Sequence, residues 1–440
     1  MVDWPSVTIG DVGTVFDGPH ATPKTVDSGP IFLGIGALQN GRINLGETRH
    51  VTPDDFKTWT KRVKPQEDDV VFSYETRLGE AAIIPKGLEC CLGRRMGLVR
   101  LKRDLMDPRF FLYVYISPKY QAFLRAKTIQ GATVDRIALT EFPSFPLPLP
   151  PLIEQQAIAS ILGDLDDKIE LNRRMNETLE AMARALFKDW FVDFGPTRAK
   201  QEGMAPYLPS ELWDLFPERL DGDGRPEGWR IAAIGDLCRR IAMGPFGSDI
   251  KKDNFIDSGV PVVRGSNLTK GFVEDSFVFV SEVKANQLRN ANAFPGDIVI
   301  THRGTLGQVG LIPEGSLFPR YVVSQSQMLL AVNQDVSTSR YIYEFLLSPM
   351  GQHALLANTS QTGVPAIARP TASVRAIKII VPPAELLQYF DVLVAPLYKL
   401  RHHRINESRT LAQTRDLLLP KLMSGEIRVK DAEKTMEAHL

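Results

Sequence analysis

The sequence predicts an α+β fold in which two similar globular domains are separated by two long helices that pair antiparallel as a coiled coil. Two observations predict this fold. Blocks from the first half of the chain return in the second half at an offset of about 230 residues, and each half ends in a long segment whose apolar residues recur every seven positions. The duplication implies a pseudo-twofold internal repeat.

Length and composition agree with a protein of this kind. A chain of 440 residues exceeds one ordinary hydrophobic core, so at least two domains are expected. No apolar run approaches the roughly 20 residues of a membrane span, and no signal-peptide pattern is present, so we expect a cytoplasmic protein with no membrane partner. Basic and acidic residues both number 52, but a neutral total does not exclude a nucleic-acid partner, because binding depends on where cations cluster.

The first domain is predicted to span residues 1–146. The runs VTIGDVGTVF, PIFLGIGAL, DVVFSY, EAAIIP and GLVRL predict strands, and DPRFFLYVYISPKYQAFLRAK predicts a helical stretch broken by Pro118. Cys90 and Cys91 are adjacent and Cys238 lies far from them in the chain, so the three form neither a disulfide framework nor a CxxC metal site. We expect all three to be buried as small apolar residues.

The first spacer helix region is residues 147–194. Pro151 suits the first helical position, Glu154 suits the positive end of the helix, and Gly195-Pro196 closes it. Apolar residues at heptad positions a and d predict a seam that needs a partner helix. They are Ile158, Ile161, Leu165, Met175, Leu179, Met182 and Leu186.

A connector rich in proline and glycine follows at residues 195–228, and we interpret it as a linker with one short helix around residues 211–215. Residues 229–381 then repeat the first domain. WPSVTIGDV returns as WRIAAIGDL, and EDDVVFSYETRLGEAAIIPKG (residues 67–87) returns as PGDIVITHRGTLGQVGLIPEG (residues 295–315).

The second spacer helix region is residues 382–426, before a tail at residues 427–440. It again begins with two prolines, and Pro420 should end or kink the helix near Leu419 because proline lacks a backbone N–H. Its predicted seam residues are Phe390, Leu393, Leu397, Leu400, Leu411 and Leu418.

Both seams become polar at their middle. If Ile158 faces Leu418 and Leu186 faces Phe390, then Asn172 lies opposite Arg404 and Lys168 lies near Glu407. We predict that this polar layer fixes the register of the pair, as one buried asparagine does in other coiled coils. The alternative is that these residues form a solvated face where the helices bend apart.

The geometry of such a pair suits a divided DNA site. A helix of roughly 35 residues is about 50 Å long, which is one to one and a half turns of B-DNA. Inserting about four residues into the first helix should therefore lengthen the tolerated spacer between two half-sites without changing either half-site.

Several segments resemble one family. PLPPLIEQQAIASIL, LFKDWFVDFGPTRAK, LPSELWDLFPERL, PEGWR and LLLPKLMSGEI are similar to the DNA specificity subunit of type I restriction-modification systems, over nearly the whole chain. The resemblance implies two target recognition domains that each bind half of an asymmetric double-stranded DNA site. It also implies adenine-N6 methyltransferase subunits docked on the helices and ATP-dependent restriction subunits. S-adenosylmethionine, ATP and Mg²⁺ would belong to those partners, and this chain would need no cofactor.

Candidate DNA-binding side chains lie in glycine-rich loops at matching places of the two domains. Arginine and lysine suit guanine edges and phosphates, and amides suit adenine edges. In the first domain the candidates are Arg77, Arg94, Arg95, Gln130, Thr133 and Arg136. In the second domain they are His302, Arg303, Arg320, Gln325, Gln361, Thr362 and Arg369. Weaker candidates are Lys24, Arg264 and Asn267.

The two loop sets differ in side chain: Glu75-Thr76-Arg77 stands against His302-Arg303-Gly304. Domains built alike that bind different sequences would show this, and so would a duplication that has drifted. For any single arginine in the set, a solvated charge or a structural ion pair is an equally good interpretation.

Catalytic motifs are weak. FLGIG imitates part of an S-adenosylmethionine site, but no [DN]PP[YF] motif or phosphate-binding GxxxxGK[ST] loop is present, and His402-His403 is better explained as a helix surface than as a metal site. We therefore expect a non-catalytic DNA-binding subunit. The alternatives are a stand-alone methyltransferase or nuclease, a coiled-coil scaffold that binds no DNA, and a specificity subunit that serves a fused restriction-methylation enzyme.

Overall fold

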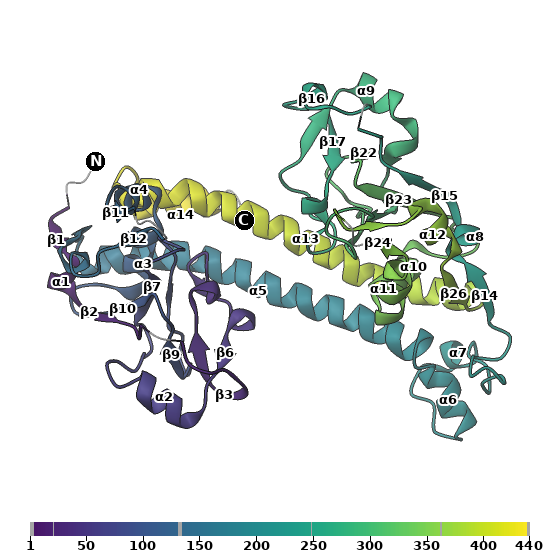
Figure 1. Ribbon diagram of the computed structural model, residues 1–440, viewed down its shortest axis with the longest axis horizontal. Coiled ribbons are helices and arrows are strands. Elements are labelled where there is room, and N and C mark those ends of the chain that lie inside the picture. The colour runs from purple at the N-terminus through teal and green to yellow at the C-terminus, as the bar shows by residue number, and fades with distance from the viewer. Residues whose placement is uncertain (1–3, 21, 131–133, 248, 361–362, 438–440) are drawn as a thin grey trace. The chain divides into compact units, whose positions relative to one another are not determined.

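The computed structural model of the protein describes residues 4–20, 22–130, 134–247, 249–360 and 363–437. The chain divides into two compact units (Figure 1). Unit 1 is Met1–Leu171 with Glu407–Leu440, and unit 2 is Asn172–Asn406. Two 40-residue helices, α5 (Leu152–Phe191) and α13 (Ala384–Met423), each give one end to unit 1 and the other to unit 2. A long helix is therefore present in each of the two predicted spacer regions, residues 147–194 and 382–426.

Unit 1 contains a four-stranded antiparallel sheet and a three-stranded sheet. The first has the order β2 (Gly13–Asp17), β10 (Met96–Leu101), β7 (Val70–Ser73), β8 (Ala81–Ile83). The second has the order β6 (Arg49–His50), β3 (Val26–Leu33), β9 (Cys90–Leu92), with β3 and β9 parallel. Two-stranded pairs are β1 (Ser6–Thr8) with β13 (Pro146–Pro148), β4 (Leu38–Gln39) with β5 (Arg42–Ile43), and β11 (Thr128–Ile129) with β12 (Arg136–Ile137).

The helices of unit 1 follow from local capping signals. They are α1 (Ile9–Val12), α2 (Pro53–Trp59), α3 (Pro108–Ile116), α4 (Pro118–Ala126) and α14 (Val429–Glu437). The Ser117 side chain caps α4 and Pro118 starts it, so the predicted break at Pro118 is confirmed. The predicted strand VTIGDVGTVF is wrong at its centre, because Thr8 and Asp11 form a capping box that starts the short α1 there.

Unit 2 contains a four-stranded sheet of the same order and a five-stranded sheet. The first has the order β15 (Cys238–Met243), β23 (Gln327–Val332), β20 (Ile298–Thr301), β21 (Val309–Leu311). The second has the order β16 (Phe255–Ile256), β18 (Val278–Val280), β17 (Val260–Val263), β22 (Tyr321–Val323), β19 (Asn292–Ala293), with β17 and β22 parallel. Further pairs are β14 (Arg230–Ala233) with β26 (Lys378–Val381) and β24 (Thr359–Ser360) with β25 (Ala366–Ile367).

The shorter helices of unit 2 include a serine cap and proline start like those of unit 1. They are α6 (Gly195–Gln201), α7 (Ser210–Trp213), α8 (Ile234–Leu237), α9 (Glu282–Gln287), α10 (Ser339–Leu347), α11 (Pro349–Leu356) and α12 (Pro370–Ala376). The segment at residues 195–228, which was predicted to be a linker, packs into the core of unit 2. Leu212 and Phe216 from this segment are buried in the core of unit 2, and Lys200 donates to the Phe216 carbonyl over 2.8 Å.

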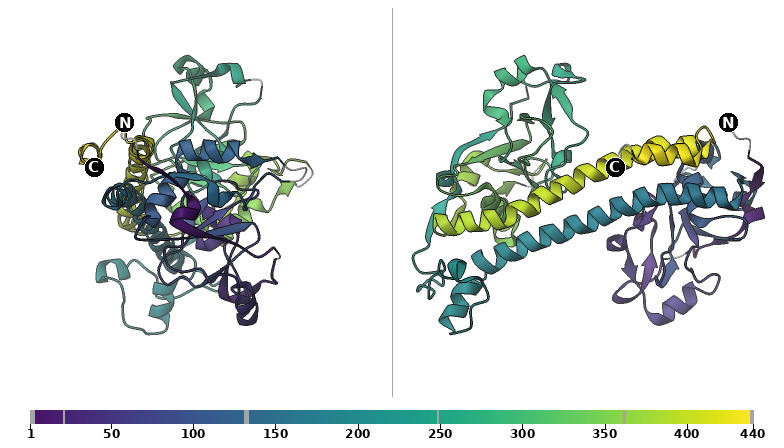
Figure 2. Two further views of the ribbon diagram at one scale, coloured as in Figure 1. Left: turned by 90° about the vertical axis from the view of Figure 1, so that its left-hand side faces the viewer. Right: turned by 180° about the vertical axis from the view of Figure 1, so that it is seen from behind.

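The two long helices run antiparallel within each unit, as Figure 2 also shows. In unit 1, Asp166 of α5 forms an ion pair of 2.7 Å with Arg415 of α13, and Lys168 lies 3.5 Å from Glu407, the neighbour that the predicted register gives it. In unit 2, the Arg401 Nε lies 2.5 Å from Glu180. Asn172 is fully buried.

Parts of the predicted seam are wrong. Met182, Leu393 and Leu400 are exposed. A straight helix repeats every 3.6 rather than 3.5 residues, and α13 turns its face at Leu386, Leu387, Phe390 and Val394 into the core of unit 2. Of the two predicted effects of Pro420, an end to the helix is wrong, because α13 continues through it to Met423.

The prediction that the cysteines are buried is confirmed for Cys90 and Cys91, whereas Cys238 is only partly buried. Cys90 and Cys91 are fully buried, and burial raises the pKa of the Cys90 thiol to about 12 and of the Cys91 thiol to about 11. Among the helices of the described residues, none combines the length and apolar character needed to cross a membrane.

Candidate nucleic-acid interface

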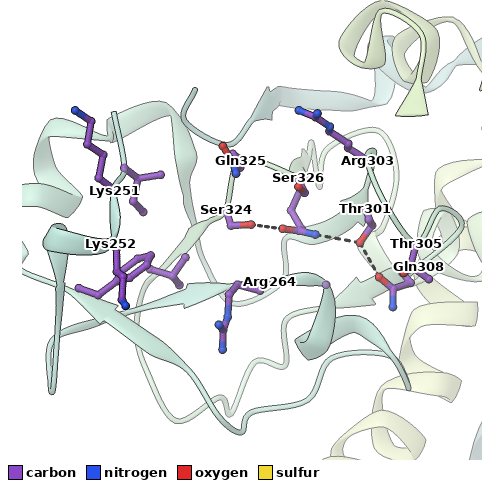
Figure 3. Close-up of a pocket in the computed structure, with 15 residues that line it drawn as sticks. Lys251, Lys252, Arg264, Thr301, Arg303, Thr305, Gln308, Ser324, Gln325 and Ser326 are labelled. Carbon is purple, nitrogen blue, oxygen red and sulfur yellow. Dashed lines mark hydrogen bonds between the residues drawn. The ribbon is translucent and has the colours of Figure 1, made fainter. Parts of the chain in front are cut away.

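Unit 2 contains an open cleft with a volume of about 480 Å³ between its two sheets (Figure 3). One wall comes from the end of β20 and the turn that leads to β21, where Thr301, Thr305 and Gln308 lie. Arg264 follows β17, and the turn from β22 to β23 carries Gln325. The cleft therefore lies where strands end and loops begin, a common place for binding residues on a rigid scaffold.

A chain of hydrogen bonds forms one side of the cleft (Figure 3). The Ser324 hydroxyl donates to Oε1 of Gln327, and Gln327 Nε2 donates to the Thr301 hydroxyl over 3.2 Å. Thr301 Oγ1 donates in turn to Oε1 of Gln308 over 2.9 Å. Gln327 and Thr301 are buried, so the chain fixes polar groups that would be costly to leave unpaired.

The cleft is positively charged. Lys251, Lys252, Arg264 and Arg303 line it, and none of its described lining residues is acidic. Lys251, Lys252 and Arg303 are also exposed. A basic cleft with several amide side chains has the donors that phosphates and the edges of DNA bases accept.

The loops around the cleft are held by backbone hydrogen bonds that recur in unit 1, and this shared set of bonds is called the frame below. The Thr301 N–H donates to the Gln308 carbonyl over 3.0 Å, and the Ser73 N–H donates to the Glu80 carbonyl over 2.9 Å. Ile367 N donates to the His302 carbonyl and Ile137 N to the Tyr74 carbonyl, both over 2.9 Å. These paired bonds confirm the block alignment of residues 67–87 with residues 295–315.

The frame corrects one comparison made from the sequence. Arg303 bridges to β25 as Glu75 bridges to β12, so Glu75 corresponds to Arg303 and not to His302. Thr76 (φ 68°) then corresponds to Gly304 (φ 95°), and both occupy the left-handed region. The comparison of Glu75-Thr76-Arg77 with His302-Arg303-Gly304 was therefore wrong by one residue, although the conclusion that the side chains differ is strengthened: a carboxylate stands where the other unit has a guanidinium.

The predicted residues of unit 1 fall into two groups. Arg95 lies 3.0 Å from Glu75 and donates to Thr76, while Arg77 donates to the Gly36 carbonyl over 3.2 Å and lies 3.4 Å from Glu80. These two arginines therefore have partners inside the unit. Exposed candidates are Arg94, Gln130 and Arg136.

In unit 2 the cleft brings Arg303 and Gln325 together with the weaker candidate Arg264. His302, predicted as a DNA contact, is instead buried: the residue is only 8% exposed, and burial lowers the pKa of its imidazole. Arg320 donates to Asn286 over 2.7 Å and pairs with Glu282, so it holds α9 instead.

The other candidates lie apart from the cleft lining. Arg369 is exposed with a left-handed backbone before α12, and Lys24 is exposed in unit 1. Asn267 is a wrong prediction for DNA contact, because it is buried and its amide donates to the carbonyls of Val273 and Asp275. Thr133, Gln361 and Thr362 lie outside the described residues.

Sequence reasoning missed Gln308, Thr301, Lys251 and Lys252. Gln308 had a signal in the sequence, because TLGQ aligns with RLGE of the first half and places Gln308 against Glu80. The lysines had none, since only the packing of the loop before β16 on the sheets brings them to the cleft. Within the described ranges no cluster of three or more histidine, cysteine or acidic residues could hold a metal ion. His402, expected on the helix surface, is instead mostly buried and lies 3.6 Å from Glu274.

Comparison with known proteins agrees with this geometry. The family model described as "Type I restriction modification DNA specificity domain" matches residues 1–181 and 226–407. The type I restriction enzyme HindI specificity subunit of Haemophilus influenzae is 25% identical over 97% of this chain and 100% of its own length. The MjaIX specificity subunit of Methanocaldococcus jannaschii is 24% identical over 98% of this chain and 94% of its own length.

A solved structure shares the fold. The crystal structure of the type I restriction-modification S subunit from M. genitalium superposes with a TM-score of 0.60 at 16% identity, and the match covers 96% of each chain. The family model covers both halves of the chain, including both frames described above. This chain therefore belongs to the family of type I restriction-modification DNA specificity domains.

Proposed function

We propose that this chain is the DNA specificity subunit of a type I restriction-modification complex, and that each unit binds one half of a bipartite, asymmetric site in double-stranded DNA. The observation that carries the proposal is the repeated frame with different side chains, Glu75 against Arg303 and Glu80 against Gln308. One scaffold with two sets of hydrogen-bonding groups is what two different half-sites require.

The subunit is proposed to select the site while its partners perform the chemistry. Relatives named as type I restriction enzyme specificity subunits support assembly with other subunits. The finer proposal is that adenine-N6 methyltransferase subunits supply methylation with S-adenosylmethionine, and that restriction subunits use ATP and Mg²⁺. We also propose a cytoplasmic location, where that DNA is found.

The exposed side of α13 supports docking of the methyltransferase. Val392 and Leu393 are exposed apolar neighbours on this helix, and Tyr389 lies one turn before them. Adjacent exposed apolar side chains favour a protein interface. Changing Val392→Glu with Leu393→Glu should abolish co-purification with the methyltransferase subunit, whereas DNA binding by the chain alone should be unchanged. Equal co-purification of the variant would contradict the docking proposal.

The central experiment is to express the chain with its cognate methyltransferase subunit and map N6-methyladenine across a genome. A bipartite motif with a fixed spacer is the expected result, and no shared motif among the methylated sites would refute the proposal. Methylation or cleavage by the purified chain alone would favour the stand-alone enzyme instead.

A second experiment separates DNA binding from a scaffold role. Lys251→Ala with Lys252→Ala should weaken binding to all duplexes and reduce the salt dependence of log Kd by about one per lysine, because each lysine that contacts a phosphate releases counterions. Lys378→Ala, at an exposed lysine of β26, is the matched control and should leave binding unchanged. Equal competition by random duplex and by the motif would favour the scaffold.

A further inference from the structure

Gln308 and Glu80 occupy one equivalent position at the end of the same turn. Each follows a glycine in the left-handed region, Gly307 (φ 82°) and Gly79 (φ 87°). The carbonyls of these glycines accept from Gln352 over 3.1 Å and from Gln121 over 3.0 Å. In both turns the backbone is therefore held by a glutamine side chain from a neighbouring helix. This contact places the next side chain, Gln308 or Glu80, in the same position in the two units.

In unit 2 the hydrogen bonds orient the side chain at this position. Oε1 of Gln308 accepts from Thr301, which itself accepts from Gln327. Nε2 of Gln308 makes no hydrogen bond within the described part of the chain, and Gln308 is a half-buried residue of the cleft lining. Because Thr301 occupies one of the two lone pairs of the oxygen, Gln308 has two N–H donors and one remaining lone pair, so it offers the cleft more donors than acceptors.

In unit 1 the same position has the opposite chemistry. Glu80 is a carboxylate, which only accepts hydrogen bonds when ionised, and its nearest partner is Arg77 at 3.4 Å. The chain of hydrogen bonds is absent here, because strand pairing puts Met96 opposite Ser73 where Gln327 stands opposite Thr301. Nothing equivalent to the Gln327 amide therefore orders Glu80.

Donors and acceptors distinguish the bases in the major groove. Guanine and thymine present a keto oxygen there, which accepts, whereas adenine and cytosine present an amino group at the same edge, which donates. We propose, on the basis of the proposed function, that the side chain at position 308 makes unit 2 select a keto base at one position of its half-site, and that Glu80 makes unit 1 select an amino base at the corresponding position of the other half-site.

The cations around the cleft agree with this assignment. Arg264 and Arg303 line the same cleft as Gln308, so a keto oxygen or a guanine N7 meets further donors there. An amino group at that place would meet the Gln308 Nε2 and two guanidinium groups, with one lone pair of the Gln308 oxygen as the acceptor that Gln308 has left. Thr301 is a positioning residue in this arrangement, because it holds the Gln308 amide in one orientation.

The test uses the complex of the full chain with its methyltransferase subunit, and maps methylated motifs for Gln308→Glu, Glu80→Gln and the wild type. With Gln308→Glu, we expect one position of the half-site bound by unit 2 to change from a keto to an amino base, and the other half-site to stay the same. Glu80→Gln should produce the reverse change in the half-site bound by unit 1. Gln334→Glu is the matched control, because this exposed glutamine lies beyond the opposite end of β23 from Gln327 and should not alter the motif.

Duplexes that carry each of the four bases at every half-site position give a second measurement if a variant methylates poorly. Gln308→Glu should change the keto-to-amino preference by about tenfold or more at one position only. Thr301→Val should leave the wild-type base acceptable but reduce discrimination at that position, because it frees Oε1 of Gln308.

The outcomes separate the two proposals. A wild-type complex without any bipartite motif would refute the proposed function. A wild-type motif that Gln308→Glu leaves unchanged, or an affinity loss that is equal for all four bases at every position, would overturn the inference while the proposed function stands.

Discussion

Arg415 of α13 should stabilise the helix pair of unit 1 through its ion pair with Asp166 of α5, and not through its ion pair with the adjacent Asp416. Its guanidinium binds two carboxylates, Asp166 at 2.7 Å and Asp416 at 2.7 Å. The Asp166 side chain is 15% exposed and also accepts from the Tyr113 hydroxyl over 2.8 Å, whereas Asp416 is 65% exposed. The two ion pairs therefore have the same length, but the pair with Asp166 is shielded from water and the pair with Asp416 is not.

The magnitudes follow from those surroundings. A hydrogen bond to a charged group that is largely shielded from water contributes about 1.5–3 kcal/mol, so Arg415→Met should lower the stability of the unit 1 helix pair by about 2 kcal/mol. Asp166→Asn should cost about the same. Asp416→Asn should cost less than about 0.5 kcal/mol, because an exposed ion pair is weak and screened by salt.

Hydrogen–deuterium exchange is the suitable assay, because a chain with two units need not unfold in one step. A loss of about 2 kcal/mol in opening free energy corresponds to roughly 30-fold faster exchange. We expect this acceleration in peptides from residues 152–171 and 407–423 for Arg415→Met and Asp166→Asn, and no further acceleration when both changes are combined. If Asp416→Asn accelerates exchange as much as Asp166→Asn, the reasoning from burial is refuted.

Three further predictions concern a carboxyl group, the thiols and helix length. Burial raises the pKa of Glu344, so the wild type loses stability as pH rises from the unfolded pKa of about 4.3 through the folded pKa. Glu344→Gln should remove this loss. The Tm of the variant relative to that of the wild type should therefore rise between about pH 5 and pH 8. Cys90 and Cys91 should resist alkylation at about pH 8 in the folded protein and react after urea unfolding, because both thiols are buried with raised pKa values; rapid labelling of the native protein would contradict their burial. Four residues inserted near the middle of α5 add about 6 Å of helix, and methylome mapping should show a longer spacer with both half-sites retained.

Local chemistry allowed much of the fold to be predicted from the sequence. The repeat at one offset, the long helices directly after the two proline pairs and the break at Pro118 depend on residues that are neighbours in the chain, and these features match the structure, although α5 begins at Leu152, one residue after the predicted Pro151. The predicted approach of Lys168 to Glu407 followed from periodicity together with an antiparallel pairing of the two apolar seams, since a helix fixes the spacing of its own side chains.

The tertiary structure decided which polar side chains are available to bind DNA. His302 and Asn267 were predicted as DNA contacts because they lie in loops, but both are buried inside unit 2, and the Asn267 amide donates to two backbone carbonyls there. Arg320 is held by Glu282, which lies 38 positions away in the chain. No local pattern encodes such pairs, because each depends on strands and helices that meet only after folding.

The sequence by itself determined that this protein has two copies of one scaffold and long helices with a repeating apolar face. Packing decided which side of those helices is covered and which groups face the cleft. In α13, Leu393 is exposed and Phe390 is buried in the core. In the cleft, the hydrogen bonds that run from Ser324 to Gln308 fix the orientation of the Gln308 amide. Periodicity is a property of the chain, whereas burial and hydrogen-bond partners belong to the folded arrangement, and the proposed choice of bases depends on the second.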